Sequence, residues 1–310
     1  MKYFNSTLVA DLSLIKHSTS IKRTNIYGTI HKMISIVIPT YNNLDYLKLC
    51  LKSLKQNSNF DHEIILHINN GSDGTLDFAI NNNYKHTSSE TNIGLCSAIN
   101  KAAKLVSNKY ILYSHDDMYF CPEWDRVLLN EVNILNDDKF YLSGTMIEPN
   151  SGHIAYDFGT DLESFQEKEL LLKYKDINFY DHQGTHFAPH LVSKRMWDIV
   201  GGFSEEFNPG IASDPDFNMK LWKEGVRIFK GLNNFKVYHF GSLTTRKKKN
   251  FIQNRGDKTF LKKWGITTKF FKKHYLRSKT IYDGPLSEPK MNIEYILGLL
   301  SCKIKSIFTI

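Results

Sequence analysis

Long apolar runs are missing from this chain of 310 residues. A helix that crosses a membrane needs about 18–20 consecutive apolar residues. The nearest approach is the short stretch YILGLL, which is soon followed by Lys303 and Lys305. The N-terminus has no continuous apolar segment and no small-residue cleavage site, so the sequence predicts no secretory signal peptide. We therefore expect a cytoplasmic protein.

Cysteine pairs are absent too. Cys50, Cys96, Cys121 and Cys302 form no Cys-x-x-Cys pair and no zinc-finger spacing, which argues against a disulfide scaffold and favours a reduced compartment. Acidic residues are outnumbered, since 40 Lys and Arg face 32 Asp and Glu and give a formal charge of +8. This excess favours an anionic partner, whether nucleic acid, a membrane surface or a phosphorylated substrate, and does not choose among them.

What the chain does contain is an alternation of apolar strands and amphipathic helices. The first half reads strand, helix, strand, helix, helix, strand over residues 34–38, 44–56, 62–68, 75–82, 92–106 and 110–114. This order predicts an α/β fold with a parallel sheet covered by helices. We expect Pro39 to end the first strand. The second half is less regular, with strands over 141–147, 185–193 and 226–241 and helices over 194–202 and 213–225.

Polar segments follow three of the predicted strands: PTYNN, NNGSDG and SHDDM. Ligands of open α/β sheets bind outside the carboxyl ends of the strands, so we expect these segments to line one edge. In the third segment His115 precedes Asp116 and Asp117. Carboxylates suit a divalent cation that also holds substrate phosphates. The alternative is that one of the aspartates caps the next helix.

The chain carries SIVIPTYNN, NNGSDGT, TNIGLCSAIN, SHDDM, VGGFSEEF and SDPDFNMKLWKEG in this order. Their order and spacing resemble family 2 glycosyltransferases over about residues 33–245. The resemblance implies a GT-A fold, an α/β fold with a Rossmann-like, mostly parallel central sheet flanked by helices. It also implies an N-terminal extension (1–32), a nucleotide-sugar half (33–120), an acceptor half (121–245) and a basic C-terminal extension (246–310).

The resemblance implies that Pro39, Thr40 and Tyr41 help to seat a nucleotide-diphosphate sugar. Asn69 and Asn70 stand where the family normally has two aspartates. An amide can still form hydrogen bonds with the imide edge of uracil or thymine, but it binds the adjacent donors of guanine less well than a carboxylate does. This favours a UDP- or dTDP-sugar.

Further nucleotide-sugar contacts that the resemblance implies are Asp73, Asn92, Gly94 and Asp116. Asp116 would hold the ribose or orient the metal site. Judged by its residue type and place, Asp73 is a turn residue.

The Asp-x-Asp motif of the family matches residues 115–117, with His115 in place of the first aspartate. The resemblance assigns Asp117 to a Mg²⁺ or Mn²⁺ ion that neutralises the leaving diphosphate. His115 removes one negative charge, so we expect weaker metal binding. His239 follows a predicted strand and matches a histidine that contacts the metal or the diphosphate in many relatives, although a lone histidine also fits a structural role. An imidazole ligand favours Mn²⁺ over Mg²⁺.

Asp214 matches the catalytic base of the family, with Ser213 where glutamate is common. In an inverting transfer this carboxylate takes the proton of the acceptor hydroxyl as the oxygen attacks the anomeric carbon. The alternative is that Asp214 or Asp216 caps the helix over 213–225, and Asp216 fits that role better.

On the acceptor side the resemblance points to His186, His190 and Trp197, although Trp197 at helical spacing also fits the core. Residues 246–249 form either a basic flap over the phosphates or a solvated loop. Residues 258–310 interleave Lys and Arg with Phe, Trp and Tyr. They predict either helices packed on the catalytic domain or an element in peripheral contact with an anionic membrane.

The combined features predict an inverting, metal-dependent glycosyltransferase. Its acceptor would be a glycan or a lipid-linked glycan in cell-surface polysaccharide synthesis, in the cytoplasm or at the inner face of a membrane. A nucleotidyltransferase is disfavoured because PTYNNLDYLK lacks a glycine-rich basic loop. A noncatalytic relative that binds sugar nucleotides or glycans stays open because of His115, Asn69 and Asn70. The basic, aromatic tail also suits a nucleic-acid module, but no nucleic-acid motif appears, so we expect no nucleic-acid partner.

Overall fold

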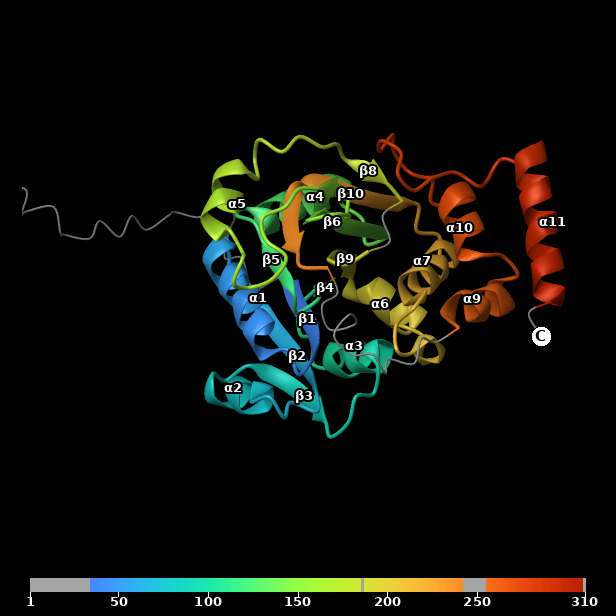
Figure 1. Cartoon of the computed structure of the whole chain (residues 1–310). Helices are drawn as coiled ribbons and strands as arrows, with labels where there is room; N and C mark the ends of the chain where they lie inside the picture. Colours follow the sequence, from blue (N-terminus) through green and yellow to red (C-terminus); the bar gives the residue numbers. More distant parts are fainter. Residues whose placement is uncertain (1–33, 185–186, 242–254, 309–310) are drawn as a thin grey trace, which may run out of the picture. The chain divides into compact units, whose positions relative to one another are not determined.

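A computed structural model describes residues 34–184, 187–241 and 255–308 (Figure 1). Within these ranges the strands are β1 (Ile34–Tyr41), β2 (Glu63–Asn69), β3 (Lys85–Ser89), β4 (Tyr110–Tyr113), β5 (Met118–Phe120), β6 (Phe140–Glu148), β7 (Ile154–Ala155), β8 (His182–Gln183), β9 (His190–Ser193) and β10 (Ile228–His239). The helices are α1 (Leu44–Asn57), α2 (Thr75–Asn81), α3 (Leu95–Ala103), α4 (Trp124–Leu135), α5 (Glu167–Lys173), α6 (Lys194–Val200), η1 (Glu205–Phe207), α7 (Ser213–Lys223), α9 (Gly256–Trp264), α10 (Thr268–His274) and α11 (Ile293–Ile307).

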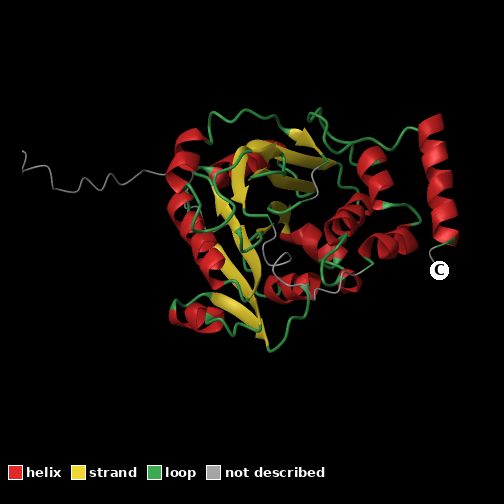
Figure 2. Cartoon of the chain, viewed as in Figure 1, coloured by secondary structure: helices red, strands yellow, loops and turns green. Residues whose placement is uncertain are grey.

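The strands of the described ranges form one ten-stranded sheet in the order β3-β2-β1-β4-β9-β6-β10-β5, with β7 beside β6 and β8 beside β10. β1 pairs in parallel with β2 and β4, β2 with β3, and β6 with β10. β9 is antiparallel to both β4 and β6, so β6 and β10 run in the same direction as β1. Helices surround this sheet (Figure 2). The prediction of an α/β fold with a mostly parallel sheet is confirmed.

The first half of the sheet differs from the prediction in detail. β3, with the sequence KHTSS, has no aliphatic residue and is held at the edge of the sheet by its pairing with β2. β1 continues to Tyr41, so the expectation that Pro39 ends it is wrong. Pro39 lies opposite His67 of β2, whereas pairing with β4 stops at Val37. Proline is therefore placed where the strand has one partner, which is where a strand tolerates a missing N–H group.

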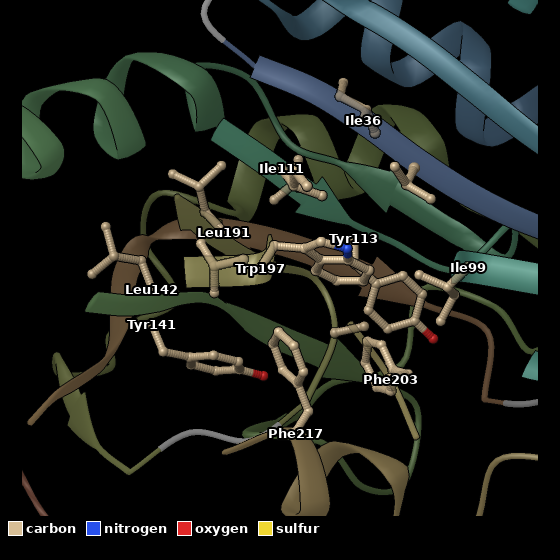
Figure 3. Packing of buried hydrophobic residues seen from close by; sticks show 14 of the residues in the cluster. Ile36, Ile99, Ile111, Tyr113, Tyr141, Leu142, Leu191, Trp197, Phe203 and Phe217 are labelled. Carbon is tan, nitrogen blue, oxygen red and sulfur yellow. The ribbon is translucent and has the colours of Figure 1, made fainter. Parts of the chain in front are cut away.

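An aromatic cluster joins the second half of the sheet to α6 and α7. Phe203 and Phe217 stack with their ring centroids 4.8 Å apart, and Trp197 lies 5.3 Å from Phe217. Tyr113 of β4 and Tyr141 of β6 lie beside these rings (Figure 3). All of these side chains are buried, so their packing fixes α7 relative to the ends of β4 and β6.

The C-terminal helices α9 and α10 share the hydrophobic core of the sheet. Phe260, Phe271 and Leu276 are fully buried in it. α11 packs against α9 and α10. For α9, α10 and one side of α11, this arrangement corresponds to the predicted alternative of helices packed on the rest of the chain. No helix in the described ranges is both long enough and apolar enough to cross a membrane.

Candidate active site

The carboxyl ends of the parallel strands bring polar side chains to one edge of the sheet. The last residues of β1, β2, β4, β6 and β10 are Tyr41, Asn69, Tyr113, Glu148 and His239. These strands run in the same direction, so their ends meet at the same edge. In the parallel pair of β6 and β10, Ile147 lies opposite Tyr238, which makes Glu148 and His239 neighbours.

His115, Asp117 and His239 form a cluster whose potential ligand atoms lie within 4.8 Å of one another. Nε2 of His239 is 3.2 Å from Oδ1 of Asp117, and Nδ1 of His115 is 4.0 Å from the same oxygen. On the other side of its ring, Nδ1 of His239 is 2.5 Å from Oε1 of Glu148. The structure therefore brings Asp117 and His239 together and adds Glu148 behind them.

At the centre of this cluster, neighbouring charges shift the pKa values of His239 and Asp117 more strongly than burial does. Burial disfavours the charged form of His239, but the carboxylates of Asp117 and Glu148 raise its pKa to about 10. Burial likewise opposes the charge of Asp117, and the imidazole of His239 nevertheless lowers the pKa of Asp117 to about 2. A proton on His239 thus balances the two carboxylates.

The donor set of the cluster fits a divalent cation. Two imidazoles and one carboxylate are ligands that a transition metal such as Mn²⁺ accepts. A carboxylate on the far nitrogen, as Glu148 provides for His239, is the usual partner of a histidine that binds a metal. Such an ion would replace the proton that His239 otherwise carries.

Asp116 lies beside Thr40 and Asn43 and is not a member of the cluster. Burial first, and then the negative charge of Asp117, raise the pKa of Asp116 to about 7. The alternative in which either aspartate caps a helix is wrong. β5 lies between them and α4, whose N-cap residue is Glu123.

The turn after β2 is held by its own side chains. Oδ1 of Asn69 accepts a hydrogen bond from the backbone N–H of Ile93 at 3.0 Å. The carboxylate of Asp73 accepts from the backbone N–H groups of Leu44 at 2.9 Å and Thr75 at 3.1 Å. Asp73 thus joins the starts of α1 and α2, which is the turn role expected from its residue type.

The end of β1 adjoins this turn. The exposed Asn70 accepts a hydrogen bond from Nδ2 of Asn42 at 3.3 Å and donates one to the carbonyl of Glu90 at 3.1 Å. Oγ1 of Thr40 is buried and lies beside the carboxylate of Asp116. The end of β1 is therefore next to the carboxylates that follow β4.

The start of α3 is fastened to the loop that leads into α7. Oδ1 of Asn208 accepts a hydrogen bond from the backbone N–H of Cys96 at 3.0 Å, and its Nδ2 donates to Oγ of Ser97 at 2.8 Å. Gly94 has a φ of 84°, and a Cβ atom there would lie 2.4 Å from Oδ1 of Asn208. Asn92 accepts from the N–H of Gly94 at 2.9 Å. Only glycine permits this close approach.

Asp214 lies in the first turn of α7. Its Oδ1 atom is buried, and no described group forms a hydrogen bond with it. Burial raises the pKa of Asp214 to about 7. Burial is the main cause that raises the pKa of Tyr113. The negative charges of Asp214 and, more weakly, of Asp117 raise this pKa further. The charges of Asp214 and Asp117 thus both act on the side chain of Tyr113.

Asp216 has a different, structural place. It does not cap α7, because the N-cap residue is Ala212 and no side chain caps this helix. Its fully buried carboxylate accepts hydrogen bonds from Oγ of Ser204 at 2.6 Å and Nε1 of Trp264 at 2.8 Å. Nζ of Lys263 lies 3.0 Å from the same carboxylate. Asp216 thus ties α9 to α7.

The family model described as glycosyl transferase family 2 matches residues 35–191, which is half of the chain. The chain belongs to this family. A curated relative, the chondroitin synthase of Pasteurella multocida (strain Pm70), is 26% identical over 72% of this chain and 23% of its own length. The hyaluronan synthase of Pasteurella multocida is 26% identical over 76% of this chain and 22% of its own length. The chain thus spans less than a quarter of either synthase.

The chain is also similar to a further curated protein and to a solved structure. The uncharacterized glycosyltransferase RP339 of Rickettsia prowazekii (strain Madrid E) is 29% identical over 59% of this chain and 56% of its own length. The crystal structure of S. aureus TarS 1–349 is 20% identical, with a TM-score of 0.50, and covers 67% of this chain and 60% of that chain. This likeness concerns the fold, and it confirms the expectation of a GT-A fold.

The acceptor-side residues expected of a family 2 member are only partly described. His186 and residues 246–249 lie outside the described residues. Trp197 is 6% exposed and belongs to the aromatic cluster, so the structure gives it the core position. His190 is buried, with its Nδ1 atom 2.9 Å from the hydroxyl of Tyr141.

Two residues of this family 2 site were missed by the sequence reasoning. Glu148 ends β6, and a carboxylate at the end of a predicted strand is the same signal that singled out Asp116 and Asp117. Asn208 carried no signal, because its partners on α3 are far away in the sequence.

Proposed function

We propose that this chain transfers a sugar from a nucleotide-diphosphate sugar to a hydroxyl group of a glycan or lipid-linked acceptor, with inversion at the anomeric carbon. The observation that carries the proposal is the cluster of His115, Asp117 and His239 at the carboxyl ends of the strands in a family 2 chain. Residues 33–120 would bind the donor, and residues 121–245 would bind the acceptor. The named relatives, a chondroitin synthase and a hyaluronan synthase, support polysaccharide synthesis as the setting.

The donor would lie along the ends of β1, β2 and β4. Thr40 offers a buried hydroxyl beside the carboxylate of Asp116. Pro39, Tyr41 and the turns that contain Asn69, Asn70, Asp73, Asn92 and Gly94 would complete the nucleotide side. A UDP-sugar is favoured because the TarS fragment of the same fold was crystallised with UDP, and because amides stand at positions 69 and 70.

His115, Asp117 and His239 would hold a divalent cation, Mn²⁺ or Mg²⁺, which when bound supplies positive charge opposite the leaving diphosphate. Glu148 would keep the ring of His239 turned toward Asp117. With His115 in place of an acidic ligand, the site would have one negative charge fewer than an all-carboxylate site.

Asp214 would act as the general base. Its raised pKa, about 7, matches a group that must accept a proton near neutral pH. As the acceptor oxygen forms its bond to the anomeric carbon, its proton passes to Asp214. The bond from that carbon to the diphosphate oxygen breaks, and the electron pair leaves with the nucleoside diphosphate.

The proposal is tested by measuring nucleoside diphosphate release from a panel of UDP-, dTDP- and GDP-sugars with oligosaccharide acceptors and Mn²⁺. We expect release with UDP- or dTDP-sugars, lowered about 10²–10⁴-fold in Asp214→Asn. Asp117→Ala should abolish it. Asp77→Asn, which changes an exposed carboxylate on α2, is the matched control and should release at the wild-type rate. Turnover that is unchanged in Asp214→Asn would refute the assignment of the base.

A noncatalytic binding protein is the second candidate, and His115 is the observation that favours it. The histidine replaces an acidic ligand, and burial lowers its pKa to about 4, so it adds no charge at neutral pH. A chain that shows Mn²⁺-dependent thermal stabilisation by UDP-sugars but no release with any donor and acceptor would have this function.

A further inference from the structure

One side of α11 exposes a continuous row of large aliphatic side chains. Their exposed fractions run from 45% to 78%, and the residues are Ile293, Ile296, Leu297, Leu300, Ile304 and Ile307. Spacings of three and four residues place them on one face of the helix. We call this set the outer face of α11. Nothing in the described part of the chain covers it.

The opposite side of α11 is anchored, which fixes the direction of the outer face. Cys302 is 3% exposed, and the rings of Tyr295 and Phe270 lie 5.0 Å apart. A Cβ atom at Gly298 would lie 2.8 Å from the ring of Phe270, so α10 and α11 approach closely. Glu294 forms an ion pair with Lys273. α11 therefore presents its outer face away from α10, its neighbour in Figure 1.

The C-terminal segment that carries the outer face is strongly basic. Residues 255–308 contain 12 lysines and arginines but four aspartates and glutamates, so this segment alone has the net charge of the whole chain, +8. At 100° per residue, Lys303 lies beside the outer face, and Lys305 lies further round the helix toward the anchored side; both are exposed. Lysines at the borders of an apolar face can extend toward headgroups while the aliphatic residues enter the lipid.

We propose that the outer face of α11 binds the surface of a membrane rich in anionic lipid, with the helix lying in the plane of the interface. An apolar helix face on a basic segment is the combination that such binding requires. The excess positive charge adds attraction to anionic headgroups and orients the chain with α11 toward them.

A second copy of the chain is the other occupant to consider, and the same observations disfavour it. The outer face extends over 15 residues of helix, about two heptads, whereas coiled-coil pairing is indicated by three to four or more. Bringing two copies together through α11 would also juxtapose two segments of net charge +8, which repel each other.

The test is flotation of the full chain with vesicles of phosphatidylethanolamine and phosphatidylglycerol, and with vesicles of phosphatidylcholine alone. We expect binding to the anionic vesicles that weakens with salt. Leu300→Glu should weaken it about tenfold to a hundredfold, because one leucine no longer enters the lipid. Lys303→Glu combined with Lys305→Glu should weaken binding to anionic vesicles and leave any binding to phosphatidylcholine unchanged.

Ile134→Glu is the matched control, since Ile134 on α4 is 76% exposed and lies outside the outer face. It should bind vesicles as the wild type does, and circular dichroism should show that all variants are folded. The proposal is overturned if wild type does not float with anionic vesicles, or if Leu300→Glu floats equally well. It is also overturned if the wild type does not bind vesicles and light scattering shows that it is a dimer which the Leu300→Glu substitution dissociates. None of these outcomes depends on turnover, so they are separate from the test of the transferase.

Discussion

Nε2 of His239 lies 3.2 Å from Oδ1 of Asp117, although the two residues belong to distant parts of the sequence. The pairing of β5 with β10 brings them together, because His239 lies opposite Met118, the residue after Asp117. Glu148 then meets the other nitrogen of the ring. The pairing of the strands therefore assembles the donor set, because it places His239 at the end of β10 next to Asp117, which follows β4.

Removing the charge of Glu148 should weaken metal binding without removing a ligand. We expect Glu148→Gln to lower the affinity for Mn²⁺ about 10–100-fold, because the ring of His239 loses the carboxylate that orients it. Isothermal titration with Mn²⁺ measures this directly. Glu163→Gln, an exposed change, is the control. Equal affinities for the two variants would show that Glu148 does not orient the ligand.

The pH dependence of turnover should report Asp214. A general base works only when it is deprotonated, and burial raises the pKa of Asp214 to about 7. We therefore expect kcat/KM to rise with pH through about 7 and to level off above it. A profile that is already flat between pH 5 and 8 would contradict a base with this pKa.

Asp214 should also lower stability at high pH. Its pKa is about 7 in the folded chain against 3.8 for the ordinary group, so the folded state holds the proton more tightly. The contribution of this proton to the stability of the fold is fully present at low pH and is lost as pH rises toward 7. Asp214→Asn should therefore stabilise the fold by about 1–3 kcal/mol at pH 8, where the charge of a half-buried carboxylate is removed, and change little at pH 4.

The contrasting variant in the same thermal melts is Asp216→Asn. Asp216 accepts hydrogen bonds from Ser204 and Trp264 and pairs with Lys263, so its loss should destabilise the fold by at least about 1 kcal/mol at pH 8. Two carboxylates in one helical turn would then have opposite effects. If both variants were destabilised alike, the distinction between a functional and a structural aspartate would be wrong.

Gly94 should be intolerant of any side chain because of Asn208. Gly94→Ala and Gly201→Ala both place a side chain at positive φ, but only the first meets another group, Oδ1 of Asn208 at 2.4 Å. We expect Gly94→Ala to lower the melting temperature more than Gly201→Ala and to raise KM for the donor, because the start of α3 must shift. Equal melting temperatures and an unchanged KM would contradict this account.

Much of the fold could be predicted from the sequence, because buried parallel strands are continuous apolar runs and the helices between them are amphipathic. β3 could not, since KHTSS has no apolar pattern and depends on pairing with β2. β5 has three residues, which is too short for a periodic signal. The roles expected for Asp117, Asp214 and the other site residues rest on the resemblance and stay predictions.

The spatial relations of the site were harder to predict. The sequence marked Asp117 and His239 as candidates, but only the strand order shows that they meet. Asp216 was expected to cap α7, and it instead binds Trp264 and Lys263, which lie beyond the recognised motifs. Tertiary hydrogen bonds of this kind leave no local pattern in the sequence.

The most direct test of the central claim is anomalous diffraction from crystals grown with Mn²⁺ and UDP. The account predicts one manganese peak within coordinating distance of Asp117 and Nε2 of His239, with the diphosphate on the same ion and Asp214 facing it. A manganese ion and UDP bound away from the ends of β4 and β10, or a diphosphate with no open path to Asp214, would contradict it.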